Sequence, residues 1–210
     1  MKPEFLKEVL EKIKSGKIAI VGDYCLDAYW FVDESKSEIS IETGKPTQPV
    51  RRQKYSLGGA GNVANNLAAL EIKEITAFGV VGKDPFGAEM ISIMNKTGIN
   101  TKNMLTQEKE WATHVYIKPH VGENEQSRVD FGNFNYLSDE TADRLIQNLQ
   151  KETIDTDLVI INQQVLSGIH TEYFRQKLVE VINLFPDKIF IADSRNYTDN
   201  YRGAYRKMND

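Results

Sequence analysis

Hydrophobic residues along the chain follow two alternating patterns. Short apolar runs, typical of strands buried on both faces, occupy residues 17–21, 75–81, 158–161 and 188–192. Apolar residues also recur at helical spacing in five segments: 4–15, 63–70, 85–97, 138–149 and 171–184. Buried strands that alternate with amphipathic helices predict an α/β fold, in which helices cover both faces of a mainly parallel sheet.

Two stretches break this rhythm, residues 28–57 and residues 111–134. The first is polar and shows no helical pattern, and the second alternates as exposed antiparallel strands do. We predict that both form a small β-sheet lid on a body made of residues 1–27, 58–110 and 135–210. The alternative is two long loops, but a loop near 30 residues is uncommon unless it is functional. An exposed sheet edge is a liability unless it is paired, so we expect a homodimer through the lid.

Length and composition narrow the class of protein. A chain of 210 residues is long enough for one domain with a sizeable core. Its formal net charge of −4 argues against an extended nucleic-acid-binding face, and no apolar run approaches the roughly 18 residues of a membrane span. The single cysteine, Cys25, rules out an internal disulfide and fits a cytoplasmic location. The three histidines are scattered and predict no metal site.

Polar residues follow three of the predicted strands. Asp23 and Asp27 come after the first, Asn162 after the third and Asp193 after the fourth. The carboxyl ends of parallel strands meet at one edge of an open α/β sheet, where ligands bind. Carboxylates and amides suit a ligand rich in hydroxyl groups, because each can form several hydrogen bonds. The alternative for each residue alone is a helix cap or a turn.

The segment LGGAGNVANNLAAL, residues 57–70, places a glycine pair before a helix. Gly58 and Gly59 permit close approach of the backbone to a ligand, and Asn62 adds an amide in the first helical turn. A tight turn between a strand and a helix is the plainer interpretation. The segment matches neither GxGxxG nor GxxxxGK[ST], so a nucleotide-dependent oxidoreductase and a P-loop enzyme are both disfavoured.

Two further groups have both a functional and a structural interpretation. Tyr29 and Trp30 are able to stack on a sugar ring, although aromatic pairs of this kind more often pack inside a protein. Arg51 and Arg52, with Lys54, are able to hold a substrate phosphate, although such runs are usually solvated.

Three segments in order, VGDYCLDAYW, GGAGNVANNLAAL and FGVVGKDPFG, resemble the ribokinase-like PfkB sugar kinases. ISIETGKPTQPV, SRVDFGNFN and ADSRNYTDNYRGAYRKMND are similar to the branch that contains the heptose-phosphate kinases. The resemblance implies a three-layer α/β/α body with a β-sheet lid. It also implies transfer of the γ-phosphate of ATP to a hydroxyl of a sugar or sugar phosphate, with Mg2+.

The resemblance assigns roles to particular residues. Asp27 is expected to bind sugar hydroxyls, and Asp130 to lie near the substrate on a lid strand. Gly58, Gly59 and Asn62 are expected to line the same pocket. Asp23 and Asn162 are expected around the sugar because of their place at the strand ends. Asp193 and Asn209 are expected on the nucleotide side.

Two departures from the family pattern bear on these expectations. The third strand ends in NQQVLSG, where the heptose-kinase branch tends to have an aspartate and a tyrosine, so nucleosides and fructose phosphates stay open as substrates. Asn209 matches the first position of the family's NxxE motif, and the sequence contains no GAGD. We therefore expect the general base to lie beyond Asp210, the chain to be the sugar-binding N-terminal portion of a kinase, and these residues alone to be inactive. The alternative is a non-catalytic remnant that binds a sugar or a protein.

Overall fold

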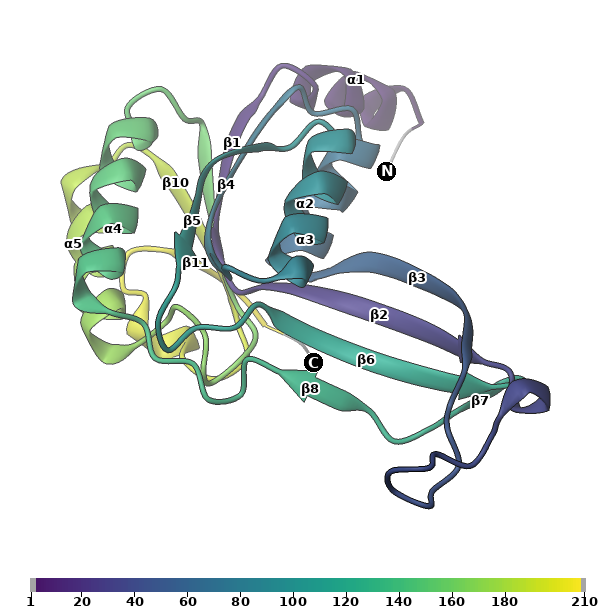
Figure 1. Ribbon diagram of the computed structural model, residues 1–210. Helices are drawn as coiled ribbons and strands as arrows, with labels where there is room; N and C mark the ends of the chain where they lie inside the picture. Colours follow the sequence, from purple (N-terminus) through teal and green to yellow (C-terminus); the bar gives the residue numbers. More distant parts are fainter. Residues whose placement is uncertain (1–2, 209–210) are drawn as a thin grey trace.

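The computed structural model describes residues 3–208, which form two β-sheets with flanking helices (Figure 1). The larger sheet has six strands in the order β11-β10-β9-β1-β4-β5, and all its strand pairs are parallel. Its strands are β1 (Lys17–Gly22), β4 (Glu74–Gly82), β5 (Asn100–Gln107), β9 (Leu158–Gln163), β10 (Ile189–Ser194) and β11 (Tyr205–Lys207). The central strands β1 and β4 are almost entirely buried, as expected for a sheet covered on both faces.

Helices cover both faces of this sheet. They are α1 (Pro3–Ile13), α2 (Ala60–Ala69), α3 (Pro85–Lys96), α4 (Asp139–Thr153) and α5 (Glu172–Leu184). Helices α2 and α3 lie on one face, and α4 and α5 lie on the other (Figure 1). Side chains of Asp84, Ser138 and Thr171 cap the first turns of α3, α4 and α5. The body is therefore the predicted three-layer arrangement.

The second sheet projects from the body (Figure 1). It contains β2 (Tyr24–Val32), β3 (Val50–Gly59), β6 (His114–Val121), β7 (Asn124–Glu125) and β8 (Val129–Phe131). Strand β2 runs antiparallel to β3 and parallel to β6. Alternate side chains on one face, including Leu26, Ala28, Val115 and Ile117, are buried in the core cluster that also holds residues of α2 and α3. The opposite face carries the polar side chains.

The predicted α/β fold with a mainly parallel sheet and a separate small sheet is confirmed. Strand β2 begins at Tyr24 and β3 ends at Gly59, so both lid strands reach past the predicted segment 28–57 into the body. The sequence analysis missed strands β5 and β11. Both lie at edges of the large sheet, where polar residues replace the continuous apolar pattern that revealed the central strands.

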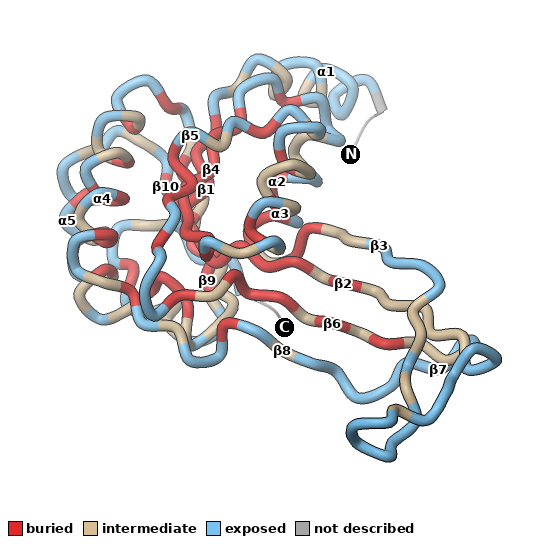
Figure 2. The backbone as a smooth tube through the Cα atoms, in the orientation of Figure 1, coloured by how far each residue is buried: buried red, intermediate tan, exposed pale blue. Residues whose placement is uncertain are grey.

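Burial divides the molecule along its length (Figure 2). The central strands of the large sheet and the adjoining ends of β2 and β6 are buried, whereas the outer end of the lid and its connecting loops are largely exposed. The base of the lid is therefore buried against the body, and its tip is exposed to solvent.

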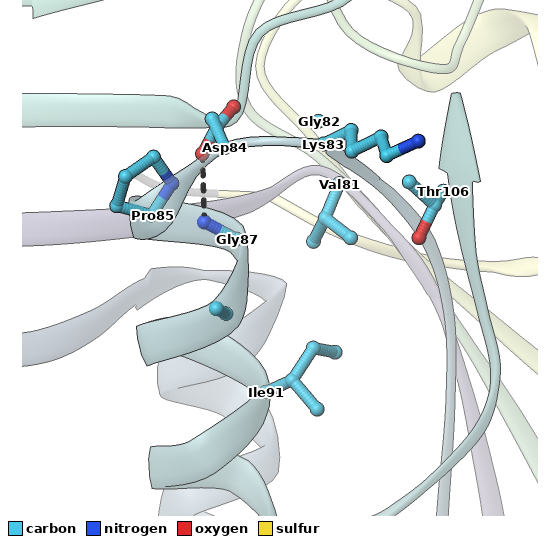
Figure 3. Close-up of a pocket in the computed structure, with 9 residues that line it drawn as sticks. Val81, Gly82, Lys83, Asp84, Pro85, Gly87, Ile91 and Thr106 are labelled. Carbon is cyan, nitrogen blue, oxygen red and sulfur yellow. Dashed lines mark hydrogen bonds between the residues drawn. The ribbon is translucent and has the colours of Figure 1, made fainter. Parts of the chain in front are cut away.

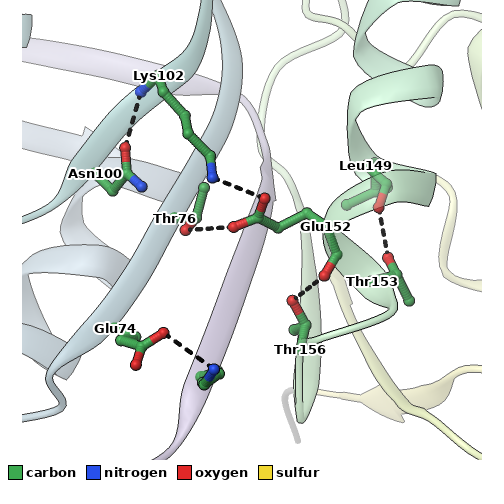
Figure 4. Close-up of polar contacts among 9 residues, drawn as sticks. Glu74, Thr76, Asn100, Lys102, Leu149, Glu152, Thr153 and Thr156 are labelled. Atoms are coloured by element: carbon green, nitrogen blue, oxygen red, sulfur yellow. Dashed lines mark hydrogen bonds and ion pairs between the residues drawn. The ribbon is translucent and has the colours of Figure 1, made fainter.

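Polar contacts fasten the amino ends of the large sheet (Figure 4). The Glu152 carboxylate of α4 accepts a hydrogen bond from Thr76 Oγ1 at 3.2 Å and forms an ion pair with Lys102 Nζ at 2.9 Å. Lys17 and Glu74 pair across β1 and β4 at 3.6 Å. These contacts tie three strands to α4 at the end of the sheet opposite the carboxyl ends, so they serve the fold rather than a ligand.

Candidate functional site

The carboxyl ends of three central strands meet at one edge of the large sheet. Strand register places Gly22 beside Asn162, and Asn162 beside Asp193. Asn162 is 2% exposed; its Nδ2 donates to an Asp193 oxygen at 3.4 Å, and its Oδ1 has no partner within the described residues. Asn162 and Asp193 therefore meet at this edge, as predicted, whereas Asp27 lies on lid strand β2.

The lid presents a polar face beside this edge. Asp27 lies on β2 and is partly exposed, with its carboxylate 2.7 Å from Lys118 Nζ of β6. Tyr29, two residues on along β2, lies beneath the same ammonium group, which is 5.0 Å from the ring centroid. Burial lowers the pKa of Lys118, but hydrogen bonding to Asp27 and the charge of that carboxylate outweigh it, so the pKa of Lys118 rises above its ordinary value. The face thus holds a carboxylate and a cation side by side.

Asp130 extends this face across β8. Strand register places Asp130 beside Tyr116, and Tyr116 beside Asp27. Arg128 donates to both Asp130 oxygens, at 2.6 and 2.8 Å, and its guanidinium lies 4.6 Å from the Tyr116 ring centroid. The structure therefore brings Asp27 and Asp130 onto one surface, each already paired with a cation.

The glycine pair forms the junction between the lid and α2. A Cβ on Gly58 would lie 3.1 Å from Asp27 Oδ2, so glycine leaves the space beside that carboxylate open. Gly59 has φ of +55°, and a Cβ there would meet the Asp23 carbonyl oxygen. Asn62 is exposed in the first turn of α2. Both glycines therefore lie close to the protein's own aspartates, Gly58 to Asp27 and Gly59 to Asp23.

Asp23 does not have the open carboxylate that the sequence analysis expected. It is 2% exposed, and its two oxygens accept hydrogen bonds from the backbone N–H groups of Gln164, Val165 and Ile169 at 2.8–3.1 Å. A ligand reaching this carboxylate would have to displace those donors. The turn role that the sequence left open describes this residue better than direct substrate binding.

A polar pocket of about 360 Å³ lies beyond β9, β10 and β11. Its lining residues are Gln164, Asp193, Ser194, Arg195, Thr198, Lys207 and Met208. Asp193 pairs with Lys207 at 3.2 Å. Arg195 is exposed and has no ion pair within residues 3–208. It lies close enough to Cys25, at the base of the lid, for its positive charge to oppose weakly the rise in the pKa of that thiol caused by burial. This pocket therefore adjoins the lid base and offers cationic groups. Asn209, predicted on the nucleotide side, lies outside the described residues.

The structure distinguishes the aromatic and basic lid residues that face the polar surface from those that pack inside the protein or pair with other lid residues. Trp30 packs against the core and Tyr29 lies on the polar face, so only Tyr29 remains available for stacking. Arg51 pairs with Asp33 at 2.6 Å, and Arg52 lies 4.1 Å from the Phe31 ring centroid. The sequence analysis did not single out Lys118 or Arg128. The signal for Lys118 was its place in the alternating run 114–121, where it falls opposite the buried residues.

Cys25 is buried at the base of the polar face. Burial, followed by the nearby charge of Asp23, raises the pKa of its thiol to about 12. A thiol of this kind is protonated at neutral pH and is a poor nucleophile. Cys25 therefore has the environment of a packing residue at the base of the lid.

A hollow of about 650 Å³ lies between α3 and the carboxyl ends of β4 and β5 (Figure 3). Its ionic groups are already paired: Asp84 accepts from the N–H groups of Gly87 and Thr113, each at 2.8 Å, and Lys83 pairs with Glu108 at 2.8 Å. Residues 3–208 contain no group of three metal-ligating side chains, and none of their helices is long and apolar enough to cross a membrane.

Comparison with known proteins gives consistent results. The pfkB family carbohydrate kinase profile matches residues 15–135, more than half of the chain. The bifunctional protein HldE of Wolinella succinogenes is 28% identical over 188 residues, which cover 89% of this chain and 38% of that protein. The D-beta-D-heptose 7-phosphate kinase of Bordetella bronchiseptica is 36% identical over 121 residues, which cover 58% of this chain and 37% of that protein. The chain thus spans about two-fifths of the length of these relatives.

Solved structures agree on the fold. A putative phosphofructokinase from Staphylococcus aureus aligns with a TM-score of 0.62 at 16% identity, covering 88% of this chain and 55% of that one. Ribokinase from Giardia lamblia aligns with a TM-score of 0.58 at 21% identity, and the alignment covers 90% of this chain and 57% of that one.

Proposed function

This chain belongs to the pfkB family of carbohydrate kinases, and we propose that it supplies the acceptor-binding side of an ATP-dependent sugar or sugar-phosphate kinase. The observation that carries the proposal is the Asp27–Lys118 pair on the polar face of the lid, beside the bare backbone of Gly58. A carboxylate accepts hydrogen bonds from two neighbouring hydroxyl groups, which a sugar provides. The Lys118 ammonium group, 2.7 Å from that carboxylate, adds hydrogen-bond donors for the same ligand.

The charges around this pair favour a phosphorylated sugar over a neutral one. Lys118 and Arg128 lie on the face with Asp27, and Arg52 and Lys54 follow on the same side of β3, beside Phe31 and Tyr29. Cations therefore outnumber the two carboxylates, Asp27 and Asp130. Arginine and lysine side chains bind phosphate through charge-assisted hydrogen bonds. Heptose 7-phosphate is the first candidate, since one relative is named for acting on it.

The nucleotide would lie across the pocket that contains Asp193 and Arg195. The Arg195 guanidinium, which has no ion pair in the described part of the chain, suits a phosphate, and Lys207 stands at the same pocket. ATP would supply the phosphoryl group and Mg2+ would neutralise its charge. No residue is assigned to the metal, because no cluster of metal-ligating side chains occurs among residues 3–208.

Assembly and location belong to the same proposal. Ile39 and Ile41 are strongly exposed in the connection between β2 and β3, at the tip of the lid, which favours a homodimer through the lid. Cys25 is buried and free, which suits the cytoplasm.

Isothermal titration calorimetry with heptose 7-phosphate, fructose 6-phosphate, ribose, a nucleoside and ATP tests the proposal. We expect sugar phosphates to bind more tightly than the neutral sugars. Lys118→Met removes the charge and keeps a chain of similar length, so it should reduce the preference for sugar phosphates. A coupled assay with ATP and Mg2+ then separates a kinase from a non-catalytic binding protein. Equal, negligible heats from every sugar would refute acceptor binding.

A further inference from the structure

The loop that follows β9, residues 164–169, has an unusual anchor. Asp23 Oδ2 accepts from the N–H groups of Gln164 and Val165, at 2.8 and 3.1 Å, and Oδ1 accepts from the N–H of Ile169 at 2.9 Å. The donors lie more than 140 residues away in sequence from this carboxylate. One side chain thus holds both ends of the loop.

The backbone of Asp23 joins this anchor to the other parts of the candidate site. Its N–H donates to the Asn162 carbonyl at 3.0 Å, and its carbonyl accepts from Ala60 N–H at 2.9 Å, at the start of α2. The end of β1, the end of β9, the first residue of α2 and the loop 164–169 therefore meet at one residue. That residue is also the step from the large sheet to the lid, since β1 ends at Gly22 and β2 begins at Tyr24.

Glycine closes this junction on two sides. A Cβ on Gly168 would lie 2.0 Å from Asp23 Oδ1, and a Cβ on Gly59 would lie 2.2 Å from the Asp23 carbonyl oxygen. Neither approach is possible for a residue with a side chain. The two glycines of the sequence motifs, in GGAG and in LSG, therefore serve the same aspartate.

The loop contributes directly to the candidate site. Gln164 lines the polar pocket with Asp193 and Arg195. Gly59, on the other side of Asp23, directly follows Gly58, which borders the Asp27 carboxylate. A change at Asp23 would therefore move the wall of the nucleotide-side pocket and the glycine pair beside Asp27 together.

We propose that Asp23 is a positioning residue, whose buried carboxylate holds the loop 164–169 in the place that shapes the acceptor and nucleotide sides of the site. Its charge is required, because an ionised carboxylate accepts at both oxygens, whereas an asparagine amide presents N–H groups to one set of donors. This inference rests on the proposed function for its effect on ligand binding. It does not rest on that function for its effect on the loop.

Amide hydrogen exchange measured by NMR tests the anchor without any ligand. In Asp23→Asn, we expect exchange at Gln164, Val165 and Ile169 to accelerate by about tenfold or more, because hydrogen bonds to a charged group are lost. The matched control is Asp157→Asn, since Asp157 also accepts a backbone N–H, that of Lys17 at 2.8 Å, but at the opposite end of the sheet. Unchanged exchange at the three loop amides would overturn the anchor.

A second variant keeps the test decisive if Asp23→Asn fails to fold. Gly168→Ala leaves the Asp23 carboxylate in place and forces the loop away from it. We expect the same three amides to exchange faster, and calorimetric affinities for heptose 7-phosphate and for ATP each to fall by about tenfold. Faster exchange with unchanged affinity for both ligands would overturn the role at the site. A wild-type chain that binds neither ligand refutes the proposed function, while the exchange experiment still decides on the anchor.

Discussion

Side chains alternate between the two faces in both sheets of this protein, but the large sheet is buried on both faces and the lid is buried on only one. In the large sheet, β1 and β4 bury residues on both faces, so their positions are occupied by apolar side chains. In the lid, β2 buries Leu26 and Ala28 on one face and presents Asp27 and Tyr29 on the other. A sheet covered twice has no surface left for a ligand, whereas a sheet covered once has a full face available.

This difference separates stability from binding. Loss of a buried side chain in the large sheet affects the packing of α2–α5, whereas loss of a polar side chain on the lid affects only the exposed face. Each substitution below tests one side of that division.

The largest expected effect is on the core of the large sheet. Phe78 on β4 is fully buried, so Phe78→Ala should destabilise the protein by about 3–5 kcal/mol. Phe131 on the lid is 39% exposed, and Phe131→Ala should cost about 1 kcal/mol or less. Urea unfolding of both variants measures the contrast, and equal losses would contradict a division between the sheets.

The next effect is on binding through the lid. Asp27→Asn should weaken sugar-phosphate binding by about 1.5–3 kcal/mol, because hydrogen bonds to a charged acceptor are lost. Asp33→Asn is the control, since Asp33 is also a lid aspartate paired with a cation, Arg51, but lies near the tip. Calorimetry measures both affinities. Asp27 has no part in the site if its variant binds as tightly as the control.

A moderate effect is expected on the pH dependence of stability, through His170 in the body. Burial lowers the pKa of His170, against the opposing influence of the Asp23 charge and of the Asn162 carbonyl. A His whose pKa is depressed on folding takes up a proton more readily when unfolded, so stability is full above the ordinary pKa of 6.5 and is lost as pH falls below it. The urea midpoint should therefore drop between pH 7.5 and pH 5.5. In His170→Asn the drop should be smaller; an identical drop would assign the pH dependence to other groups.

The smallest effect on stability is expected at the lid tip. Ile41 is 98% exposed, so Ile41→Lys should change the free energy of unfolding by no more than about 0.5 kcal/mol. If the lid forms a homodimer, the same substitution should shift the protein toward monomer in analytical ultracentrifugation. Met208→Lys, at an exposed residue of the body, is the control. A wild-type monomer at tens of micromolar would count against the dimer.

The sequence predicted the central elements because they repeat a simple pattern. All five helices and the strands β1, β4, β9 and β10 follow uninterrupted apolar periodicity. Strand β5 was not predicted because its sequence, NTKNMLTQ, mixes polar with apolar residues at an edge of the sheet. The family and its fold were also predictable, since the glycine and aspartate motifs occur in the family's order.

Individual roles were harder to predict. Asp23 and Asp27 look equivalent in VGDYCLDAYW, yet one accepts three backbone N–H groups and the other pairs with Lys118. The partners that decide these roles lie some 90 to 146 residues further along the chain. Local sequence carries no information about them, because tertiary contacts are set only when the chain is folded.

The long reach of the Asp23 anchor has a consequence for synthesis on the ribosome. Asp23 and Ile169 are 146 residues apart, and translation proceeds at about 5–20 residues per second, so the carboxylate waits roughly 7 to 30 s for its last donor. During that interval β1 and β4 are available to pair, but the group that joins the two sheets is still hydrated. The lid can therefore assemble on a body whose ligand-binding edge is unfinished, and competence to bind arises only after the loop 164–169 has been made.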